Sequence, residues 1–209
     1  MIKTIIFDFS GVSDDLVSTY KAAMDVLDIR GIERITFEQF KDFYALPWDN
    51  FYKNMGITGI DLKEEYGIWD GIASKYCDLV KPMKGAKEVL SKLRKLGIRS
   101  IILSARGNVA LEMDIKKHGF NDLIDGVMGD VCDKKEVIHD LLEEHNFKKE
   151  STIYVGDMPH DIETAHHAGV RGVAVLSGFG KKDELIAEKP DFVISEISEL
   201  VGLVESLNK

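Results

Sequence analysis

The sequence predicts an α/β protein: a doubly wound parallel sheet with an inserted all-helical domain. Three observations favour this fold class. Six short runs rich in apolar and β-branched residues recur along the chain, and helical patterns separate most of them. Most runs are continuously apolar, as expected for strands that helices cover on both faces. After the first run, a long stretch contains helical patterns only, which breaks the alternation of strands and helices.

The six predicted strands alternate with helices, which favours parallel pairing. They are Thr4–Phe9, Arg99–Ser104, Leu123–Met128, Thr152–Gly156, Gly172–Leu176 and Asp191–Ile194. Four segments between them have apolar residues at helical spacing or helix boundary signals, namely Lys84–Leu96, Asn108–His118, Lys134–His145 and Pro159–Ala168. A proline at the start and a glycine after the end, as in the last of these, is the arrangement expected of a helix.

Residues 14 to about 80 are predicted to form the inserted helical domain. The expected helices are Asp15–Ile29, Thr36–Ala45 with a capping box between Thr36 and Gln39, a segment near Phe51, and Asp61–Tyr76. We therefore assign residues 1–13 and 82–209 to the α/β core and residues 14–81 to the insert. Aromatic residues concentrate in the insert, and we expect most of them to build its own core, while one or two face a substrate.

Composition restricts the class of partner. The chain has 209 residues and a formal net charge of −9, which argues against nucleic acid or an anionic membrane as the main partner. Cys77 and Cys132 are the only cysteines and have no metal-ligand spacing, so we expect reduced thiols in a cytoplasmic protein. The apolar run before Asp8 is too short for a signal peptide, and no long apolar segment follows. The oligomeric state cannot be read from the sequence.

Carboxylates follow two of the predicted strands. Asp8 ends the first run, and Asp157 follows Thr152–Gly156, with Asp161 four residues later near a helix start. Alone, Asp157 fits a turn residue and Asp161 a helix cap. Together with Asp8 they indicate a site, because ligands bind at the carboxyl edge of open α/β sheets. Such a group of carboxylates suits Mg²⁺, which takes one or two carboxylates, water and substrate phosphate oxygens.

Two further positions carry candidate chemistry. Ser104 ends the second long strand, where its hydroxyl and the following backbone amides can bind phosphate oxygens, although Ser104 taken alone fits a simple helix cap better. Lys134 opens a helix, where a cation is unfavourable with respect to the helix dipole. This position suggests a use in neutralising phosphate and a nucleophilic carboxylate, with a solvated surface pair with Lys135 as the alternative. Arg106 fits a solvent-facing arginine better than a ligand for a second anionic group.

With these residues in this order, the sequence resembles the haloacid dehalogenase superfamily over nearly its whole length. The matching segments are Phe7-Asp8-Phe9-Ser10-Gly11, Leu103-Ser104, Lys134 and Gly156-Asp157-Met158-Pro159-His160-Asp161. The resemblance implies a Rossmann-like core, a helical cap and phosphoryl transfer through an aspartyl-phosphate. The nearest likeness is to small-metabolite phosphatases of the phosphoglycolate phosphatase kind, so the expected substrate is a small phosphorylated metabolite.

The resemblance also implies roles for individual residues. Asp8 would be the nucleophile, and Ser104 and Lys134 would stabilise the phosphoryl oxygens, with Lys135 as the alternative lysine. The Mg²⁺ ligands would be the Asp8 carboxylate, the backbone carbonyl of Ser10, Asp157, and Asp161 directly or through water.

The sequence departs from the family at Ser10, where most of its phosphatases have a second aspartate that protonates the leaving group. Val12 likewise replaces the usual threonine. Serine does not titrate near neutral pH, and general acid–base catalysis contributes about 10²–10⁴-fold. Either turnover is slower or another group carries the proton, with Asp14, Asp15 and His160 as candidates. Alternatively, the substrate is an acyl phosphate, a phosphonate or a halo acid that needs no such acid, or the protein only binds a phosphorylated ligand.

Overall fold

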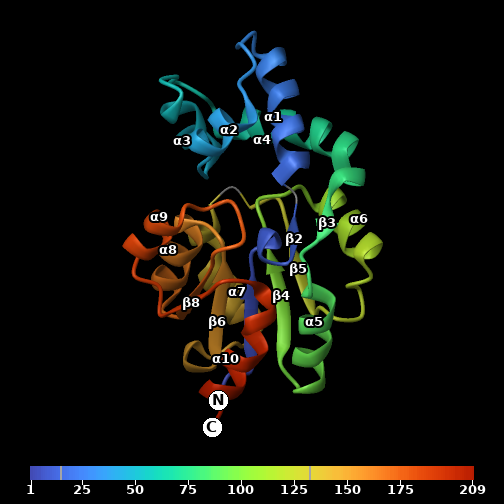
Figure 1. Cartoon of the computed structure of the whole chain (residues 1–209), viewed down its shortest axis with the longest axis vertical. Helices are drawn as coiled ribbons and strands as arrows, with labels where there is room; N and C mark the ends of the chain where they lie inside the picture. The colour runs from blue at the N-terminus through green and yellow to red at the C-terminus, as the bar shows by residue number, and fades with distance from the viewer. Residues whose placement is uncertain (15, 132) are drawn as a thin grey trace.

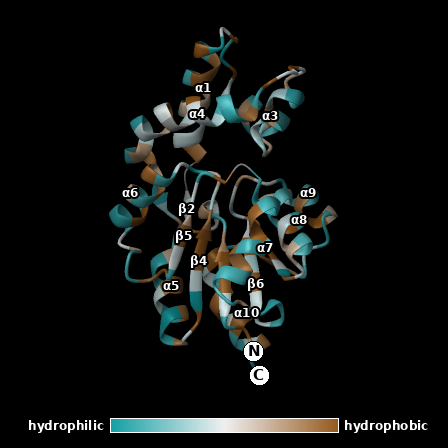
Figure 2. Ribbon diagram, turned by 180° about the vertical axis from the view of Figure 1, so that it is seen from behind, coloured by the Kyte–Doolittle hydropathy of each residue, from teal (hydrophilic) through white to brown (hydrophobic). Residues whose placement is uncertain are grey.

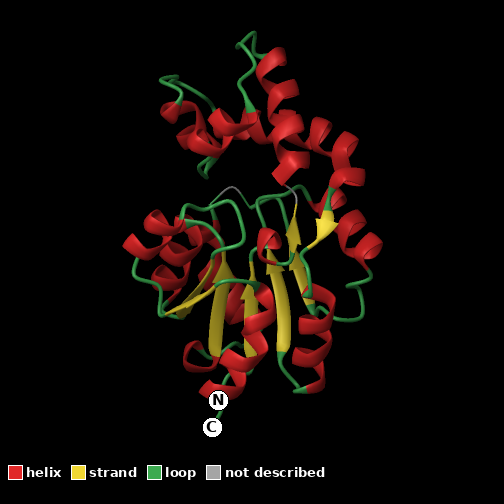
Figure 3. Ribbon diagram, viewed as in Figure 1, coloured by secondary structure: helices red, strands yellow, loops and turns green. Residues whose placement is uncertain are grey.

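The computed structural model describes residues 1–14, 16–131 and 133–209. Within them lies a six-stranded sheet in the order β5-β4-β1-β6-β7-β8, with every neighbouring pair parallel. Helices flank this sheet, and a separate group of helices lies beyond the carboxyl ends of its strands (Figures 1 and 3). The predicted α/β fold class is confirmed.

The strands keep the predicted order; four are shorter than predicted, β6 has the predicted bounds, and β7 lies one residue earlier. They are β1 (Thr4–Phe7), β4 (Arg99–Leu103), β5 (Gly126–Met128), β6 (Thr152–Gly156), β7 (Arg171–Val175) and β8 (Phe192–Ile194). The prediction that the third strand begins at Leu123 was wrong. Leu123 and Ile124 instead donate backbone hydrogen bonds to the Phe120 carbonyl, 2.8 and 3.2 Å away, in the turn after the preceding helix. Because the residues of this turn are apolar, the strand looked longer in the sequence than it is.

Alternate residues of the strands enter two different hydrophobic clusters, which explains why the strand sequences are continuously apolar. Ile5 and Phe7 of β1 pack with helices α5 (Ala86–Lys95), α6 (Asn108–His118) and α10 (Leu200–Leu207). Ile6, between them, packs on the other face with α7 (Lys134–Glu144) and α8 (Pro159–Ala168). In Figure 2 the strands of the sheet carry mostly hydrophobic colours between helices of mixed colour. The sheet is therefore rigidly held on both faces, which fixes the positions of its strand ends.

Two core helices were not predicted. They are α9 (Lys182–Ala187) and α10. The six residues of α9 are too few to show a period. The sequence of α10, Leu-Val-Gly-Leu-Val-Glu-Ser-Leu, is apolar on most sides and so lacks a clear polar face.

The helices between β2 and β3 build a hydrophobic cluster of their own. They are α1 (Leu16–Ile29), α2 (Phe37–Phe43), α3 (Trp48–Asn54) and α4 (Leu62–Ala73), followed by the 3₁₀ helix η2 (Ser74–Leu79). Buried aromatic side chains of this cluster include Phe40, Phe51 and Tyr52. The predicted capping box is confirmed, because Thr36 and Gln39 exchange both hydrogen bonds at the start of α2.

A short antiparallel ribbon connects this group of helices to the sheet. Its strands are β2 (Ser13–Asp14) and β3 (Lys81–Pro82), and the predicted boundaries between core and insert fall within it. We expected no strand in this stretch, and two-residue strands are too short to leave a sequence pattern. His118 of α6 holds both sides of the ribbon, because its ring nitrogens lie 3.1 Å from the Ser13 hydroxyl and 3.3 Å from the Val80 carbonyl oxygen.

None of the helices in the described ranges is long and apolar enough to cross a membrane.

Candidate active site

Asp8 is the first residue after β1 and begins a tight turn. Its backbone amide still donates to the Val155 carbonyl of β6, 2.9 Å away, so the sheet fixes its main chain. The chain then enters a 3₁₀ helix (Phe9–Gly11), which Asp8 caps by accepting a 2.8 Å hydrogen bond from the Ser10 amide at Oδ2. This bond orients the carboxylate and leaves its other oxygen, Oδ1, directed toward Lys134.

Asp157 and Asp161 lie beside Asp8, at the end of the neighbouring strand β6. One oxygen of Asp161, Oδ2, caps helix α8 by accepting from the amides of Asp157 and Met158 at 3.2 and 3.0 Å. Its other oxygen lies 2.7 Å from Lys134 Nζ. Asp8, Asp157 and Asp161 each offer a carboxylate oxygen within 4.8 Å of the others, and all three residues are buried. Asp161 therefore both caps helix α8 and contributes a carboxylate to the acidic cluster.

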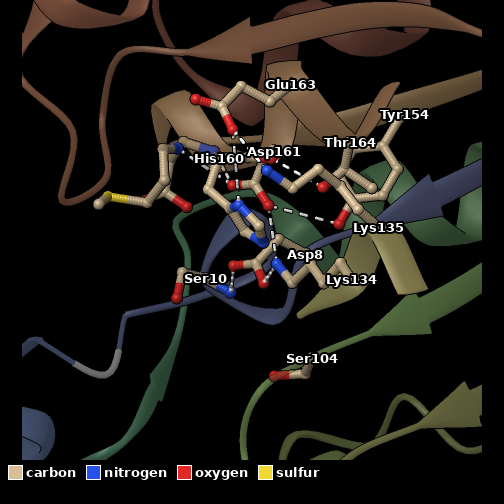
Figure 4. Close-up of polar contacts among 12 residues, drawn as sticks. Asp8, Ser10, Ser104, Lys134, Lys135, Tyr154, His160, Asp161, Glu163 and Thr164 are labelled. Atoms are coloured by element: carbon tan, nitrogen blue, oxygen red, sulfur yellow. Dashed lines mark hydrogen bonds and ion pairs between the residues drawn. The ribbon is translucent and has the colours of Figure 1, made fainter. Parts of the chain in front are cut away.

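Lys134 forms ion pairs with both Asp8 and Asp161, as the dashed lines in Figure 4 show. It is the first residue of α7 and only 2% exposed. Burial opposes its charge, but the nearby Asp161 and Asp8 carboxylates outweigh burial and hold the pKa of Lys134 well above its usual value. The pKa of Asp161 is raised, because burial and the Asp8 charge together exceed the opposing effect of Lys134. Lys134 is therefore a permanently charged bridge between two carboxylates.

Lys135 lies outside this cluster. Its ammonium group is 2.9 Å from Glu163 Oε2, and both side chains are substantially exposed. Figure 4 shows it directed toward Glu163 rather than Asp8. Of the two lysines that the sequence offered, the structure thus brings Lys134 to the carboxylates.

A glycine-rich loop after β7 holds Asp157, and the sequence analysis missed it. The Phe179 amide donates to Asp157 Oδ2 at 2.6 Å, and the Gly180 amide donates to the Asp157 carbonyl at 3.0 Å. A Cβ atom at Gly178 would overlap the Asp157 carboxylate, and one at Gly180 would overlap its carbonyl. Glycines just after a strand, in Ser177-Gly178-Phe179-Gly180, were the signal that could have found this loop.

Ser104 directly follows β4 at the same edge of the sheet and lines the same cleft as Asp8. Its hydroxyl accepts a 3.1 Å hydrogen bond from the Arg106 amide. The helix-cap alternative was wrong, because α6 begins after Gly107 and Ser104 instead closes the preceding turn. In Figure 4 Ser104 stands apart from the group formed by Asp8, Lys134 and Asp161.

The predicted position of Arg106 was wrong. We expected it to face solvent, but its side chain is 9% exposed and its Nη2 lies 2.8 Å from Oδ2 of the fully buried Asp114. It also stands over the ring of Phe9, 5.9 Å from the centroid. Sequence spacing does not pair these residues, because Asp114 lies two turns into the next helix. The turn between β4 and α6 therefore carries a buried ion pair beside the cleft.

The cleft lies between the sheet edge and the helices of the insert. Ser10, Ser104, Lys134 and His160 line it from the core side. Four aromatic residues line it from the insert, which is more than the one or two expected, and these are Tyr44, Trp48, Tyr66 and Trp69.

Of the alternative proton carriers, His160 lines the cleft. It is the second residue of α8 rather than a loop residue. Its Nε2 lies 3.5 Å from Asp133 Oδ1, and burial, reinforced by Lys134, lowers its pKa. Asp14 lies in β2, whereas Asp15 and Cys132 lie outside the described residues.

Comparison with known proteins gives consistent matches. A family model described as haloacid dehalogenase-like hydrolase matches residues 5–175. Phosphoglycolate phosphatase of Synechococcus elongatus is 27% identical over 125 residues, which is 59% of each chain; the match therefore spans less than two thirds of that protein. Pyrophosphatase PpaX of Bacillus mycoides is 26% identical over 219 residues, 99% of each chain. A hydrolase of the haloacid dehalogenase-like family from Streptococcus pneumoniae has the same fold, with a TM-score of 0.84 at 20% identity, covering 97% of this chain and 98% of that one.

Replacing Lys134 by methionine should strongly destabilise the protein in buffer without divalent ions. The substitution leaves three buried carboxylates together, and breaking a buried ion pair costs about 3–5 kcal/mol. Lys135→Met removes an exposed pair and should cost below about 1 kcal/mol. Urea unfolding followed by circular dichroism in EDTA measures both. Equal losses for the two variants would show that Lys134 does not hold the cluster together.

Proposed function

Since the chain belongs to the haloacid dehalogenase-like hydrolase family, we propose that it is a magnesium-dependent phosphatase acting on a small phosphorylated metabolite through an aspartyl-phosphate at Asp8. The relatives named phosphoglycolate phosphatase and pyrophosphatase support phosphate release as the reaction. The acidic net charge supports a metabolite rather than nucleic acid as the partner, and the two widely spaced cysteines support a cytoplasmic location.

One observation carries the proposal. Groups from four separate segments, Asp8, Ser104, Lys134 and Asp161, line one cleft at the carboxyl edge of the sheet. This edge is where open α/β sheets bind ligands. A carboxylate fixed by the sheet beside a buried ammonium group is the arrangement expected for nucleophilic attack on an anionic phosphoryl group, because the cation offsets the repulsion between the two anions.

The acidic cluster fits Mg²⁺. Asp8, Asp157 and Asp161 supply hard oxygen ligands within 4.8 Å of one another, and Lys134 forms ion pairs with two of them, Asp8 and Asp161. Three carboxylates beside one lysine leave an excess of negative charge for a divalent ion to balance. We assign the ion to the Asp8 and Asp157 carboxylates and the Ser10 backbone carbonyl, with Asp161 directly or through water. When bound, Mg²⁺ supplies positive charge next to the phosphoryl oxygens.

The protein groups then act in sequence. An Asp8 oxygen attacks phosphorus, and the bond from phosphorus to the ester oxygen breaks, so that the leaving oxygen takes a proton. Ser104 and Lys134 hold the phosphoryl oxygens, where the charge lies in this chemistry. A water oxygen next attacks phosphorus, loses its proton and displaces Asp8 as a free carboxylate. Phosphate and the original enzyme result.

Ser10 decides how fast this reaction runs. We propose that it weakens leaving-group protonation, because a serine hydroxyl does not titrate near neutral pH and another group at the cleft, such as His160, has to carry the proton. The same feature favours a second candidate function: hydrolysis of acyl phosphates, phosphonates or halo acids. Among these, carbon–halogen cleavage is the weakest candidate, because it has no need of the intact Asp157 and Asp161 pair.

We also assign the helical insert, residues 14–81, as a cap over the cleft. Its helices have a hydrophobic cluster of their own, on which Phe179 of the core packs, and the chain joins them to the core through the two-stranded ribbon β2–β3. A separately packed unit on a narrow connection can move as a body, which would admit substrate and then exclude water.

Asp8→Asn should reduce phosphate release to the level without enzyme. The test uses a chromogenic aryl phosphate with Mg²⁺, because a good leaving group depends least on a proton donor. Asp122→Asn is the matched control, since Asp122 is exposed and precedes β5 at the opposite edge of the sheet. Release that survives Asp8→Asn, or that is indifferent to EDTA, would contradict the proposed function.

Ser10→Asp should accelerate hydrolysis of an alkyl phosphate by up to about 10²–10⁴-fold, by restoring a general acid. An aryl phosphate should gain much less, because its leaving group needs no proton. Ser10→Asn has the same shape without an acid and should bring no gain. If Ser10→Asp leaves the alkyl phosphate rate unchanged or lower, then another residue already does this work and the proposed weakening is wrong.

A further inference from the structure

Among the residues that the structure describes, the insert contributes no charged side chain to the lining of the cleft. The lining residues of the insert are aromatic, aliphatic or hydroxyl-bearing, and include Ser18, Thr19, Tyr44, Trp48, Tyr66 and Trp69. Trp48 and Trp69 stack with their ring centroids 4.0 Å apart, and Tyr44 meets Trp48 edge-on at 5.5 Å. These rings brace one another, so they present a preformed apolar wall to whatever part of the substrate projects away from Asp8.

The basic groups on the core side already have acidic partners. Lys134 lies between Asp8 and Asp161. Arg106 is paired with Asp114 inside the protein, 2.8 Å away. His160 faces Asp133 and Glu163 at 3.5 and 3.9 Å. A second anionic group on the substrate would therefore enter an aromatic site and compete with internal carboxylates for its counter-ion, and burying a charge without a counter-ion is costly.

Resting on the proposed function, we infer that the substrate is a phosphate monoester whose organic part is uncharged and presents an apolar face. The phosphoryl group would take the charged end of the cleft, at Lys134 and Ser104. The organic part would lie against the tryptophan and tyrosine wall, with Ser18 and Thr19 as the hydroxyl groups that can orient it. This class differs from phosphoglycolate and pyrophosphate, the substrates in the names of the relatives, because the leaving groups of both carry negative charge.

Three esters of primary alcohols test the inference: ethyl phosphate, benzyl phosphate and phosphoglycolate. Ethyl phosphate has the two-carbon skeleton of phosphoglycolate, with a methyl group in place of the carboxylate. We expect kcat/KM to be lower for phosphoglycolate than for ethyl phosphate by roughly tenfold or more, and highest for benzyl phosphate. Phosphoglycolate equal to or better than ethyl phosphate would overturn the inference.

A binding measurement distinguishes failure of this inference from failure of the proposed reaction. Calorimetric titration of the Asp8→Asn variant with the same three esters should give the same order of affinity, with benzyl phosphate tightest and phosphoglycolate weakest. If turnover is absent but this order is found, the proposed reaction fails and the inference about the ligand class stands. If turnover depends on Asp8 but phosphoglycolate binds best, the reaction stands and the inference fails.

A change of charge in the wall gives a second readout. Tyr66 is only partly buried, so Tyr66→Arg can be accommodated and would place a cation beside the organic part of the substrate. The ratio of kcat/KM for phosphoglycolate to that for ethyl phosphate should rise roughly tenfold or more. Tyr66→Met, a neutral control, should leave the ratio unchanged. A ratio that does not respond to Tyr66→Arg would show that this wall does not face the substrate.

Discussion

The ion bridge centred on Lys134 is the interaction on which the candidate site depends. It connects the end of β1, through Asp8, to the start of α8, through Asp161, and Lys134 itself begins α7. Three segments far apart in the sequence thus meet at one buried ammonium group. Removing a cation from water is costly, and only close carboxylates make it favourable. The two carboxylates that form the bridge also keep the buried lysine charged, which the proposed phosphoryl-binding role requires.

The two sides of the cleft have complementary chemistry. The sheet edge concentrates charge, because carboxylates and Lys134 follow rigid strands and begin helices there. The helical insert contributes aromatic and hydroxyl side chains. A ligand that fits both is charged at one end and neutral at the other. Specificity in this molecule would then come from the absence of a cation in the described cap wall as much as from any contact that the wall makes.

Much of this site follows from the sequence, for a simple geometric reason. Parallel strands end at a common edge, so Asp8, Ser104 and Asp157 could be placed together from strand positions alone. The choice between Lys134 and Lys135 could not be made from the sequence, because consecutive residues of a helix point about 100° apart. The partner of Arg106 also depends on packing, since Asp114 lies on another element. The support of Asp157 by the Phe179 and Gly180 amides is made by the backbone, so only the glycines at 178 and 180 mark it in the sequence. The ribbon β2–β3 is too short to show a pattern.

The central claim, that Asp8 is the nucleophile, is tested most directly by trapping the intermediate. The enzyme is mixed with an aryl phosphate and Mg²⁺, quenched in acid during turnover, digested and examined by mass spectrometry. The account predicts one phosphoryl group on the peptide that contains Asp8, and its loss when the substrate is exhausted. A phosphoryl group on a different residue, or steady phosphate release with every peptide unmodified, would contradict it.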